Sequence, residues 1–254
     1  SGNFFMLLFI LVIAVFSALP LVLSIGMSLK PINELYLFPP TLWPRNATFD
    51  NYKMLFSLIN STRVAFSRYA FNTVFITIAT TAIHVLIASM AAYPLSKGRF
   101  LGKNFLNQIV LLALMFVPAI ADVINYQTIV SLGWLDTYMA AIAPNVATTL
   151  GLFLITNYMS TIPDTLLEAA RIDGATPRQT LFKITIPLLK PTILLTTITS
   201  TNGTLQLFDE SLNLTNGGPG KSTMTMSHYI YNTSFVQSPN FGYAAAMSIV
   251  ILVM

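Results

Sequence analysis

Ionisable side chains are scarce in the long apolar stretches of this chain, which makes the few that occur there the first candidates for chemistry. Burying such a group in a membrane is costly, so it usually serves transport, proton transfer or a specific hydrogen bond. His84 lies in mid-stretch between Ile83 and Val85, where a neutral ring bonded to a neighbouring helix is favoured over a proton relay. Asp122, near the end of another stretch, fits an interfacial residue and a member of a translocation path equally well.

A second group of candidates is the adjacent carboxylate pair Asp209 and Glu210, at the outer end of a further apolar stretch. Neighbours in sequence point in different directions on a helix, so the two do not form a general acid and base pair by themselves. We instead predict that they lie along a translocation path together with Asp122. A metal site is not supported, because the chain has two distant histidines and no cysteine.

Gly220-Lys221-Ser222 imitates the end of a phosphate-binding loop, but Thr215 stands where this motif requires its earlier glycine. We therefore expect no cofactor and no nucleotide site on this chain, so any ATP must be bound by a partner. No pairing of a nucleophile with a base is apparent either. A membrane-embedded enzyme consequently ranks last among the functions considered.

The elements that must position these residues are membrane-spanning helices. Charged residues make up 9% of the chain and hydrophobic ones 54%, whereas about a quarter of the residues in soluble domains are charged. Crossing the hydrocarbon takes about 20 apolar residues. The candidate spans are 4–29, 69–96, 104–125, 137–161, 189–208 and 240–254. We predict an all-α polytopic membrane protein with a single transmembrane domain, 1–254, whose sixth span continues past Met254.

The first span, 4–29, resembles a signal peptide only superficially. Its apolar run is much longer than the core of about 7 to 15 residues in a signal peptide, and it has no basic start. We expect it to be a retained helix. The net charge of +4 does not indicate a nucleic-acid partner, because the basic residues cluster at the ends of spans.

The distribution of basic residues predicts how the chain is oriented in the membrane. The short loop 97–103 carries three basic side chains and no acidic one, and the polar segment 162–188 carries several more. By the positive-inside rule, which gives most weight to short loops, both face the cytoplasm. The segments 30–68 and 209–240, rich in proline, glycine and polar residues, are then left for the outside.

The polar segment 162–188 carries the start and stop signals of a helical hairpin. Thr161, with Asp164 three residues later and Pro163 in the first turn, predicts a capping box at the start of a first helix. Gly174 is placed to end that helix, because glycine tolerates the left-handed conformation at a helix C-terminus.

A second start signal follows in the same segment. Thr176 is a candidate N-cap, Pro177 takes the first helical position, and Gln179 can bond back to the cap. Pro187 disfavours helical geometry at Ile186 and is predicted to end the second helix. Spacing alone would favour a solvated hairpin that merely joins two spans.

The residues that fall in register favour a functional interpretation of the segment instead. It resembles the EAA loop in the permease subunits of bacterial binding-protein-dependent ABC importers, where Glu-Ala-Ala, three residues, Gly, nine residues, Ile, one residue and Leu-Pro recur. The residues in register are Glu168, Ala169, Ala170, Gly174, Ile184 and Pro187. Ile186 replaces the usual leucine.

Further segments are similar to carbohydrate permeases of the maltose-transporter G type. These segments are Asn51-Tyr52, Asn72-Thr73, 91–103 and 133–137. Others, similar to multiple-sugar and raffinose-type permeases in particular, are 217–220, 229–231 and 242–246. Residues 202–210 depart from many relatives, which place a Trp-Asn pair there, and this leaves the sugar open but not the transporter class.

The resemblance implies a set of partners and a mechanism. The partners are a second homologous permease, two cytoplasmic ATPase subunits that bind the ATP, and an extracytoplasmic sugar-binding protein, with no nucleic acid. The complex would lie in the lipid of the bacterial cytoplasmic membrane and import a sugar by alternating access, with the sugar contacts on either permease. The rival hypothesis is an ion-coupled secondary transporter, which would need a coupling site in mid-membrane, and no convincing one is present.

The resemblance also implies roles for individual residues. Glu168 would accept a bond from an ATPase arginine, Gly174 would form the turn, and Leu181 and Phe182 would supply an apolar docking face. The coupling residues are Glu168, Ala169, Ala170, Asp173, Gly174, Leu181, Phe182, Ile184 and Pro187.

In relatives the loop before the last span reaches the solute-binding protein. The corresponding contacts here would be Asn213, Asn216, Gly217, Gly218, Pro219 and Gly220. Residues 211–222 hold flexible glycines and too little apolar area to pack as a core, so we expect them to be expendable as structure.

Overall fold

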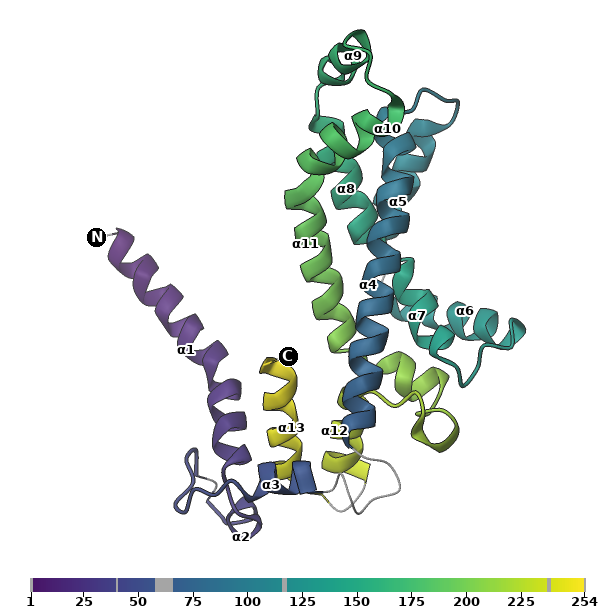
Figure 1. Cartoon of the computed structure of the whole chain (residues 1–254). Helices are drawn as coiled ribbons and strands as arrows, with labels where there is room; N and C mark the ends of the chain where they lie inside the picture. Colours follow the sequence, from purple (N-terminus) through teal and green to yellow (C-terminus); the bar gives the residue numbers. More distant parts are fainter. Residues whose placement is uncertain (1, 40, 58–65, 116–117, 237–238, 254) are drawn as a thin grey trace. The chain divides into compact units, whose positions relative to one another are not determined.

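The computed structural model describes residues 2–39, 41–57, 66–115, 118–236 and 239–253. The regular structure in these ranges is helical, and none of them contains a β-strand. The chain divides into two compact units, Ser1–Asn72 with Pro219–Met254, and Thr73–Gly218 (Figure 1). The long helix α4 (Phe66–Lys97) begins in the first unit and continues through the second.

The first unit contains both ends of the chain. Its other elements are α1 (Gly2–Ser28), α2 (Ile32–Leu35), α3 (Asp50–Ser57), the 3-10 turn η3 (Pro219–Lys221), α12 (Met226–Tyr231), the π-helical turn η4 (Asn232–Val236) and α13 (Phe241–Val253). α1 is apolar on all sides, as membrane spans are, and it packs against α13. Leu55, Tyr69 and Met247 belong to the buried core of this unit, in which the ring of Tyr69 stacks on that of Tyr229 at 4.4 Å.

Hydrogen bonds order the polar connection between α1 and α3. The Glu34 carboxylate accepts bonds from the backbone N–H groups of Arg45 and Asn46, at 2.9 and 3.0 Å, and from the Asn46 side chain at 2.9 Å. Buried Lys30 donates to the Thr41 carbonyl. Both charged groups are thus paired with polar partners, as buried charges must be. The remainder of the predicted outer segment, 58–65, lies outside the described residues.

The second unit is a helical bundle built along α4. Its other elements are α5 (Lys103–Met115), α6 (Pro118–Ser131), α7 (Tyr138–Val146), α8 (Thr149–Thr161), α9 (Asp164–Ile172), α10 (Pro177–Thr180), the π-helical turn η1 (Leu181–Thr185), α11 (Ile186–Leu205) and the π-helical turn η2 (Glu210–Leu214). α8 and α11 pack against each other. One buried cluster joins them to α4 through Ala88, Ala92, Ile155, Met159, Ile162 and Leu189. Small residues such as these alanines allow close helix approach in membrane bundles.

Four helical stretches are long and apolar enough to cross a membrane, namely Phe4–Ser28, Phe66–Lys97, Tyr138–Thr161 and Pro177–Leu205. They coincide with four of the spans predicted from the sequence. The predicted span 240–254 overlaps the shorter apolar helix Phe241–Val253, whereas the predicted span 104–125 overlaps two separate helices, Lys103–Met115 and the first half of α6. The all-α polytopic fold is therefore confirmed for the described residues, and the number of six spans stays a prediction.

Candidate functional site

The first helix of the polar segment begins two residues later than the sequence predicts. α9 starts at Asp164 with Pro163, in extended conformation, as its N-cap, and no side chain caps it. The predicted capping box at Thr161 is wrong, because Thr161 still belongs to the last turn of α8 and its hydroxyl donates to the Tyr158 carbonyl at 2.7 Å. This local side-chain bond competes with the capping geometry.

Gly174 ends α9 as predicted. Its φ of 79° is in the left-handed region. The Gly174 N–H bonds to the Arg171 carbonyl at 3.0 Å and the Ala175 N–H to the Ala170 carbonyl at 2.9 Å. This pair of bonds is the Schellman arrangement, in which the residue after the helix takes positive φ.

The start of the second short helix is also confirmed, but its predicted end is not. The Gln179 N–H donates to the Thr176 hydroxyl at 3.3 Å, and the Thr176 N–H donates to the Gln179 side chain at 2.8 Å, which completes the capping box. Pro187 does not end the helix, because α10 continues through the π turn η1 into α11. The wider π turn precedes Pro187 and accommodates the missing N–H and the ring, which an uninterrupted α-helix would not.

The predicted coupling residues are distributed over an exposed hairpin end. Glu168, Ala169, Asp173 and Gly174 are exposed, whereas Ala170 is buried together with Leu167. Leu181, Phe182 and Pro187 are exposed and Ile184 is half-buried. The structure thus presents a carboxylate next to uncovered apolar side chains, as a docking surface requires.

The sequence interpretation missed one member of this apolar surface. Ile172, in the last turn of α9, is 85% exposed, more than Phe182 at 66%. Leu166, in the first half of α9, is 47% exposed but lies two residues before Glu168 and therefore on another side of the helix. The signal was available, since Ile172 lies four residues after Glu168 and therefore on the same side of the helix.

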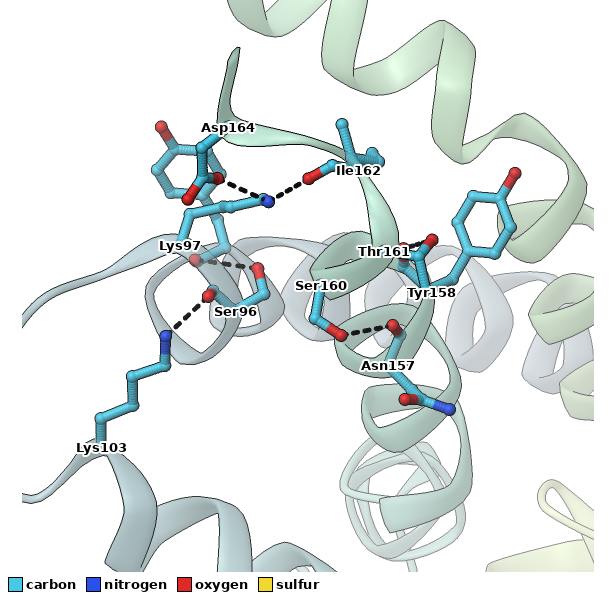
Figure 2. Close-up of polar contacts among 10 residues, drawn as sticks. Ser96, Lys97, Lys103, Asn157, Tyr158, Ser160, Thr161, Ile162 and Asp164 are labelled. Atoms are coloured by element: carbon cyan, nitrogen blue, oxygen red, sulfur yellow. Dashed lines mark hydrogen bonds and ion pairs between the residues drawn. The ribbon is translucent and has the colours of Figure 1, made fainter. Parts of the chain in front are cut away.

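Lys97 connects α4 to the start of this hairpin. Figure 2 shows its ammonium group between the Ile162 carbonyl and the Asp164 carboxylate, donating to both. The distance from Lys97 Nζ to Asp164 Oδ1 is 2.7 Å. The two basic loops that the positive-inside rule assigns to one side of the membrane therefore lie at the same end of the second unit. The sequence analysis assigned Lys97 no partner, although opposite charges at two neighbouring span ends could have suggested one.

The basic groups around Asp164 lower the pKa of its carboxyl group. The hydrogen bond and charge of Lys97, with weaker contributions from Arg99 and Lys103, hold the pKa of Asp164 below its ordinary value of 3.8. A lowered pKa means that the ion pair is fully formed above the ordinary value and is lost only as the pH falls through the lowered one. The contact is therefore present throughout the neutral range.

A second candidate site is an acidic pocket of about 330 Å³ in the second unit. Asp122 of α6 and the adjacent Asp209 and Glu210 all line it, as do Asn125, Tyr126 and Asn213. The sequence analysis placed the three carboxylates on one path, and the structure brings them together at one pocket. α11 holds this pocket roughly 30 Å from the hairpin α9–Gly174–α10, given about 1.5 Å per residue for its 20 residues.

Asn145 orients the deepest carboxylate of the acidic pocket. Its side-chain amide donates to Glu210 at 2.7 Å and is itself fixed on the Ala141 carbonyl at 3.0 Å. Asn145 was not singled out from the sequence, since it lies in an otherwise apolar stretch. It holds the Glu210 side chain in the wall of the pocket, whereas Asp209 is exposed.

His84 makes the bond to a neighbouring helix that the sequence predicts. Its Nδ1 donates to the Val146 carbonyl at 2.8 Å, where α7 ends before α8, and the Thr148 hydroxyl lies 3.3 Å from the same nitrogen. The ring is 2% exposed and lies over Gly151, where a Cβ atom would come within 2.0 Å of Nε2. His84 is therefore a positioned structural group at the break between α7 and α8.

The predicted binding-protein loop differs from the expected flexible connection. In the second unit, Glu210–Leu214 forms η2, and buried Leu214 packs with Ile129 and Ala140. The expectation that this loop has too little apolar area to pack as a core is wrong for its first part, because buried Leu214 anchors the turn to the rest of the second unit. Asn213 lines the acidic pocket, Asn216 is exposed, Gly217 is buried and Gly218 is half-buried. Pro219 and Gly220, both exposed, belong to the first unit.

A protein-family model decides among these interpretations. The model described as "Binding-protein-dependent transport system inner membrane component" matches residues 84–254. The chain belongs to this family. With four helical stretches of membrane-spanning length, the permease is a multi-pass membrane protein. The matched region includes the hairpin α9–Gly174–α10, the acidic pocket and His84.

Curated relatives of the permease carry the names of sugar transport proteins. The lactose transport system permease protein LacF of Rhizobium radiobacter is 53% identical over 98 residues, 38% of this chain and 33% of the relative. The arabinooligosaccharides transport system permease protein AraQ of Halalkalibacterium halodurans is 34% identical over 187 residues, 73% of this chain and 64% of the relative. The permease thus spans between a third and two thirds of the length of these relatives.

Two solved structures share the fold of the permease. One is a bacterial ABC transporter involved in the import of the acidic polysaccharide alginate, with a TM-score of 0.81 and 19% identity, covering 100% of this chain and 93% of the other. The second is a bacterial alginate ABC transporter in complex with an alginate pentasaccharide-bound periplasmic protein, with a TM-score of 0.65 and 19% identity, covering 99% and 92%. At this identity the likeness establishes the fold.

The electrostatics of the acidic pocket give a testable stability effect. Burial raises the pKa of Glu210, the Asn145 bond opposes this, and the charges of Asp209 and Asp122 add to it. The ionised carboxylate therefore costs stability. This cost is complete above the raised pKa, decreases as the pH falls below it and is gone below the ordinary pKa of 4.5. At pH 7, Glu210→Gln is therefore expected to raise the Tm of the purified permease.

The pH dependence of this effect provides its control. The Tm difference between Glu210→Gln and the wild type should shrink as the pH falls and vanish below the ordinary pKa of 4.5. Asp209→Asn, at an exposed position, should change the Tm less. A Tm lowered by Glu210→Gln at pH 7 would show that the ionised group stabilises the pocket, contrary to the prediction.

Proposed function

We propose that the chain is a permease subunit of an ATP-driven, binding-protein-dependent sugar importer in the bacterial cytoplasmic membrane. Its partners are a second permease, two ATPase subunits and an extracytoplasmic sugar-binding protein. The observation that carries the proposal is the exposed hairpin α9–Gly174–α10, which has the EAA residues in register and belongs to the matched family. The names of the relatives support a sugar as the substrate.

The hairpin supplies the means of coupling. An ATPase subunit would receive the exposed apolar residues Ile172 and Phe182 in a groove and pair a basic side chain with Glu168. α10 continues through η1 into α11, so a displacement of the hairpin is passed directly to a helix of membrane-spanning length. A rigid helical connection of this kind converts closure of the ATPases into movement of the spans. ATP is hydrolysed on the ATPase subunits in this scheme.

The acidic pocket supplies polar contacts for the sugar near the far end of α11. Carboxylates and the amides of Asn125 and Asn213 can bond to sugar hydroxyl groups, and Tyr126 offers a ring face. Three carboxylates would repel an acidic sugar, since like charges at one site are disfavoured. The substrate class that fits this chain is therefore a neutral oligosaccharide.

Purification of the native complex tests the proposed function. Under this proposal the tagged chain brings down an ATPase and a second permease, and the reconstituted complex takes up sugar only with ATP and the loaded binding protein. The rival ion-coupled transporter predicts a chain that takes up sugar without these partners when an ion gradient is applied. Uptake driven by the gradient alone would reject the importer.

A cysteine crosslink tests the predicted contact with the binding protein. Asn216 is exposed in a turn at φ 45°, and the chain has no native cysteine. Asn216→Cys is expected to crosslink to the binding protein when the ATPases are held in the nucleotide-bound state, because the proposed contact forms in the outward-open conformation. The yield without nucleotide should be several times lower.

A buried position on the same turn is the matched control for this crosslink. Thr215→Cys, at a residue that is 4% exposed, should give little product in either state. Equal yields for Asn216→Cys with and without nucleotide, or no product in both, would count against the proposed contact.

A further inference from the structure

One ammonium group ties together three elements at the cytoplasmic end of the second unit. Lys97 is the last residue of α4, Ile162 follows the last residue of α8, and Asp164 is the first residue of α9. Lys97 Nζ donates to the Ile162 carbonyl and, at 2.7 Å, to the Asp164 carboxylate (Figure 2). Ile162 and Pro163 are both extended. The Ile162 N–H still bonds to the Met159 carbonyl of α8 at 3.3 Å, and the Pro163 carbonyl accepts from the Leu166 N–H of α9 at 3.2 Å, so the helical hydrogen bonds of each helix end at this corner.

The position of this side chain differs from that of an ordinary lysine at a membrane surface. Such a lysine extends its ammonium towards water or lipid headgroups. The side chain of Lys97 is only 10% exposed and is directed to the corner, while Asp164 is 63% exposed. The lysine therefore gives up solvation for two specific acceptors, an arrangement that is costly to break from one side.

α9 has little other attachment to the spans. Among the described elements it packs mainly against α10, with Leu167 and Ala170 as its buried side chains. The bond from Lys97 links it to α4, which in turn packs with α8 and α11 through Ala88 and Ala92. A displacement of α9 thus reaches α4 through Lys97 and reaches α11 through α10.

We propose that Lys97 is a positioning residue that transmits the movement of the coupling helix α9 to the span α4, so that α4 and α11 move together when the ATPases close. The inference rests on the proposed function and adds a second route of coupling to it. Without the Lys97 bonds, α9 would still dock on an ATPase and ATP would still be hydrolysed. α4 would follow incompletely, and fewer sugar molecules would cross for each ATP consumed.

The test measures the ratio of sugar taken up to ATP hydrolysed in the complete reconstituted complex. Lys97→Met keeps an unbranched side chain, one atom shorter, and removes the charge. It is expected to lower this ratio about fivefold to tenfold, within the range of about 2- to 30-fold for residues along a coupling network. ATP hydrolysis should stay within about twofold of the wild type. Lys97→Arg, which retains donors for both acceptors, should restore most of the ratio.

Lys103→Met is the matched control. Lys103 also binds the end of α4, donating to the Ser96 carbonyl at 2.6 Å, but it makes no bond to α9. It should leave the ratio unchanged. A ratio that falls equally in Lys97→Met and Lys103→Met would show a merely structural role for both and overturn the inference.

A double mutant resolves the route further. Asp164→Ala leaves the Ile162 bond in place and should lower the ratio less than Lys97→Met. The combination Lys97→Met with Asp164→Ala should be no worse than Lys97→Met alone, because Lys97→Met already removes the contact that Asp164→Ala removes. If the wild-type complex transports sugar and the double variant loses as much of the ratio as the two single variants together, the inference is overturned. A wild-type complex that shows no ATP-dependent uptake would instead overturn the proposed function, and this inference with it.

Discussion

Glu168→Lys is expected to reduce ATP-dependent sugar uptake by at least about thirtyfold while the permease remains in the membrane. Glu168 is an exposed carboxylate on α9, beside the apolar residues that we propose to dock on the ATPase. Loss of one partner from a charge pair that becomes buried in an interface costs about 2–5 kcal/mol, and reversal adds repulsion. The measurement is uptake into vesicles with matched amounts of every subunit.

Two variants make the result for Glu168 interpretable. Glu168→Gln keeps a hydrogen-bond acceptor without the charge, and uptake should be intermediate. Asp50→Lys makes the same reversal at an exposed carboxylate of the first unit, and uptake should change little. Uptake by Glu168→Lys within twofold of the wild type would remove Glu168 from the coupling role.

Gly174→Val is expected to abolish most of the ATPase stimulation that the loaded binding protein produces. Gly174 has a φ of 79°, and no atom would lie within 4 Å of an added Cβ, so the penalty is conformational rather than a clash. A β-branched residue in this region costs roughly 1–3 kcal/mol. The chain would relieve the strain by changing the turn, and α10 would then point in a different direction from α9.

The same position offers a control that separates strain from bulk. Asn tolerates the left-handed conformation better than other side chains, so Gly174→Asn should retain most of the stimulation. Stimulation measured with the purified complex should therefore follow the order Gly, Asn, Val. Normal stimulation in Gly174→Val would show that the turn does not depend on glycine.

The local structure of the hairpin α9–Gly174–α10 could be predicted from the sequence wherever neighbouring residues decide it. Positive φ at Gly174 and the capping box of Thr176 with Gln179 both arise from interactions within a few residues. The apolar stretches likewise predicted the long helices, because crossing hydrocarbon requires continuous apolar sequence.

Predictions from local sequence were wrong where residues outside the local motif decided the structure. Thr161 has the spacing of a cap, but α8 continues through it and claims its hydroxyl. Pro187 disfavours helical geometry at the preceding residue, Ile186. The π turn η1 before it nevertheless lets α10 and α11 form one continuous helical element. Leu214 is one apolar residue in a polar segment, and only its contacts with Ile129 and Ala140 make it part of a core.

The sequence by itself determined that this is an all-helical membrane protein with an EAA hairpin, because hydropathy, caps and a motif are properties of residue order. Only the tertiary structure decided that Asp122 meets Asp209 and Glu210 at one pocket, and that Asn145 holds Glu210. The link from Lys97 to Asp164 likewise joins residues far apart in the chain. Sequence spacing carries no information about such pairs, since which helix ends meet is set by the packing of whole helices.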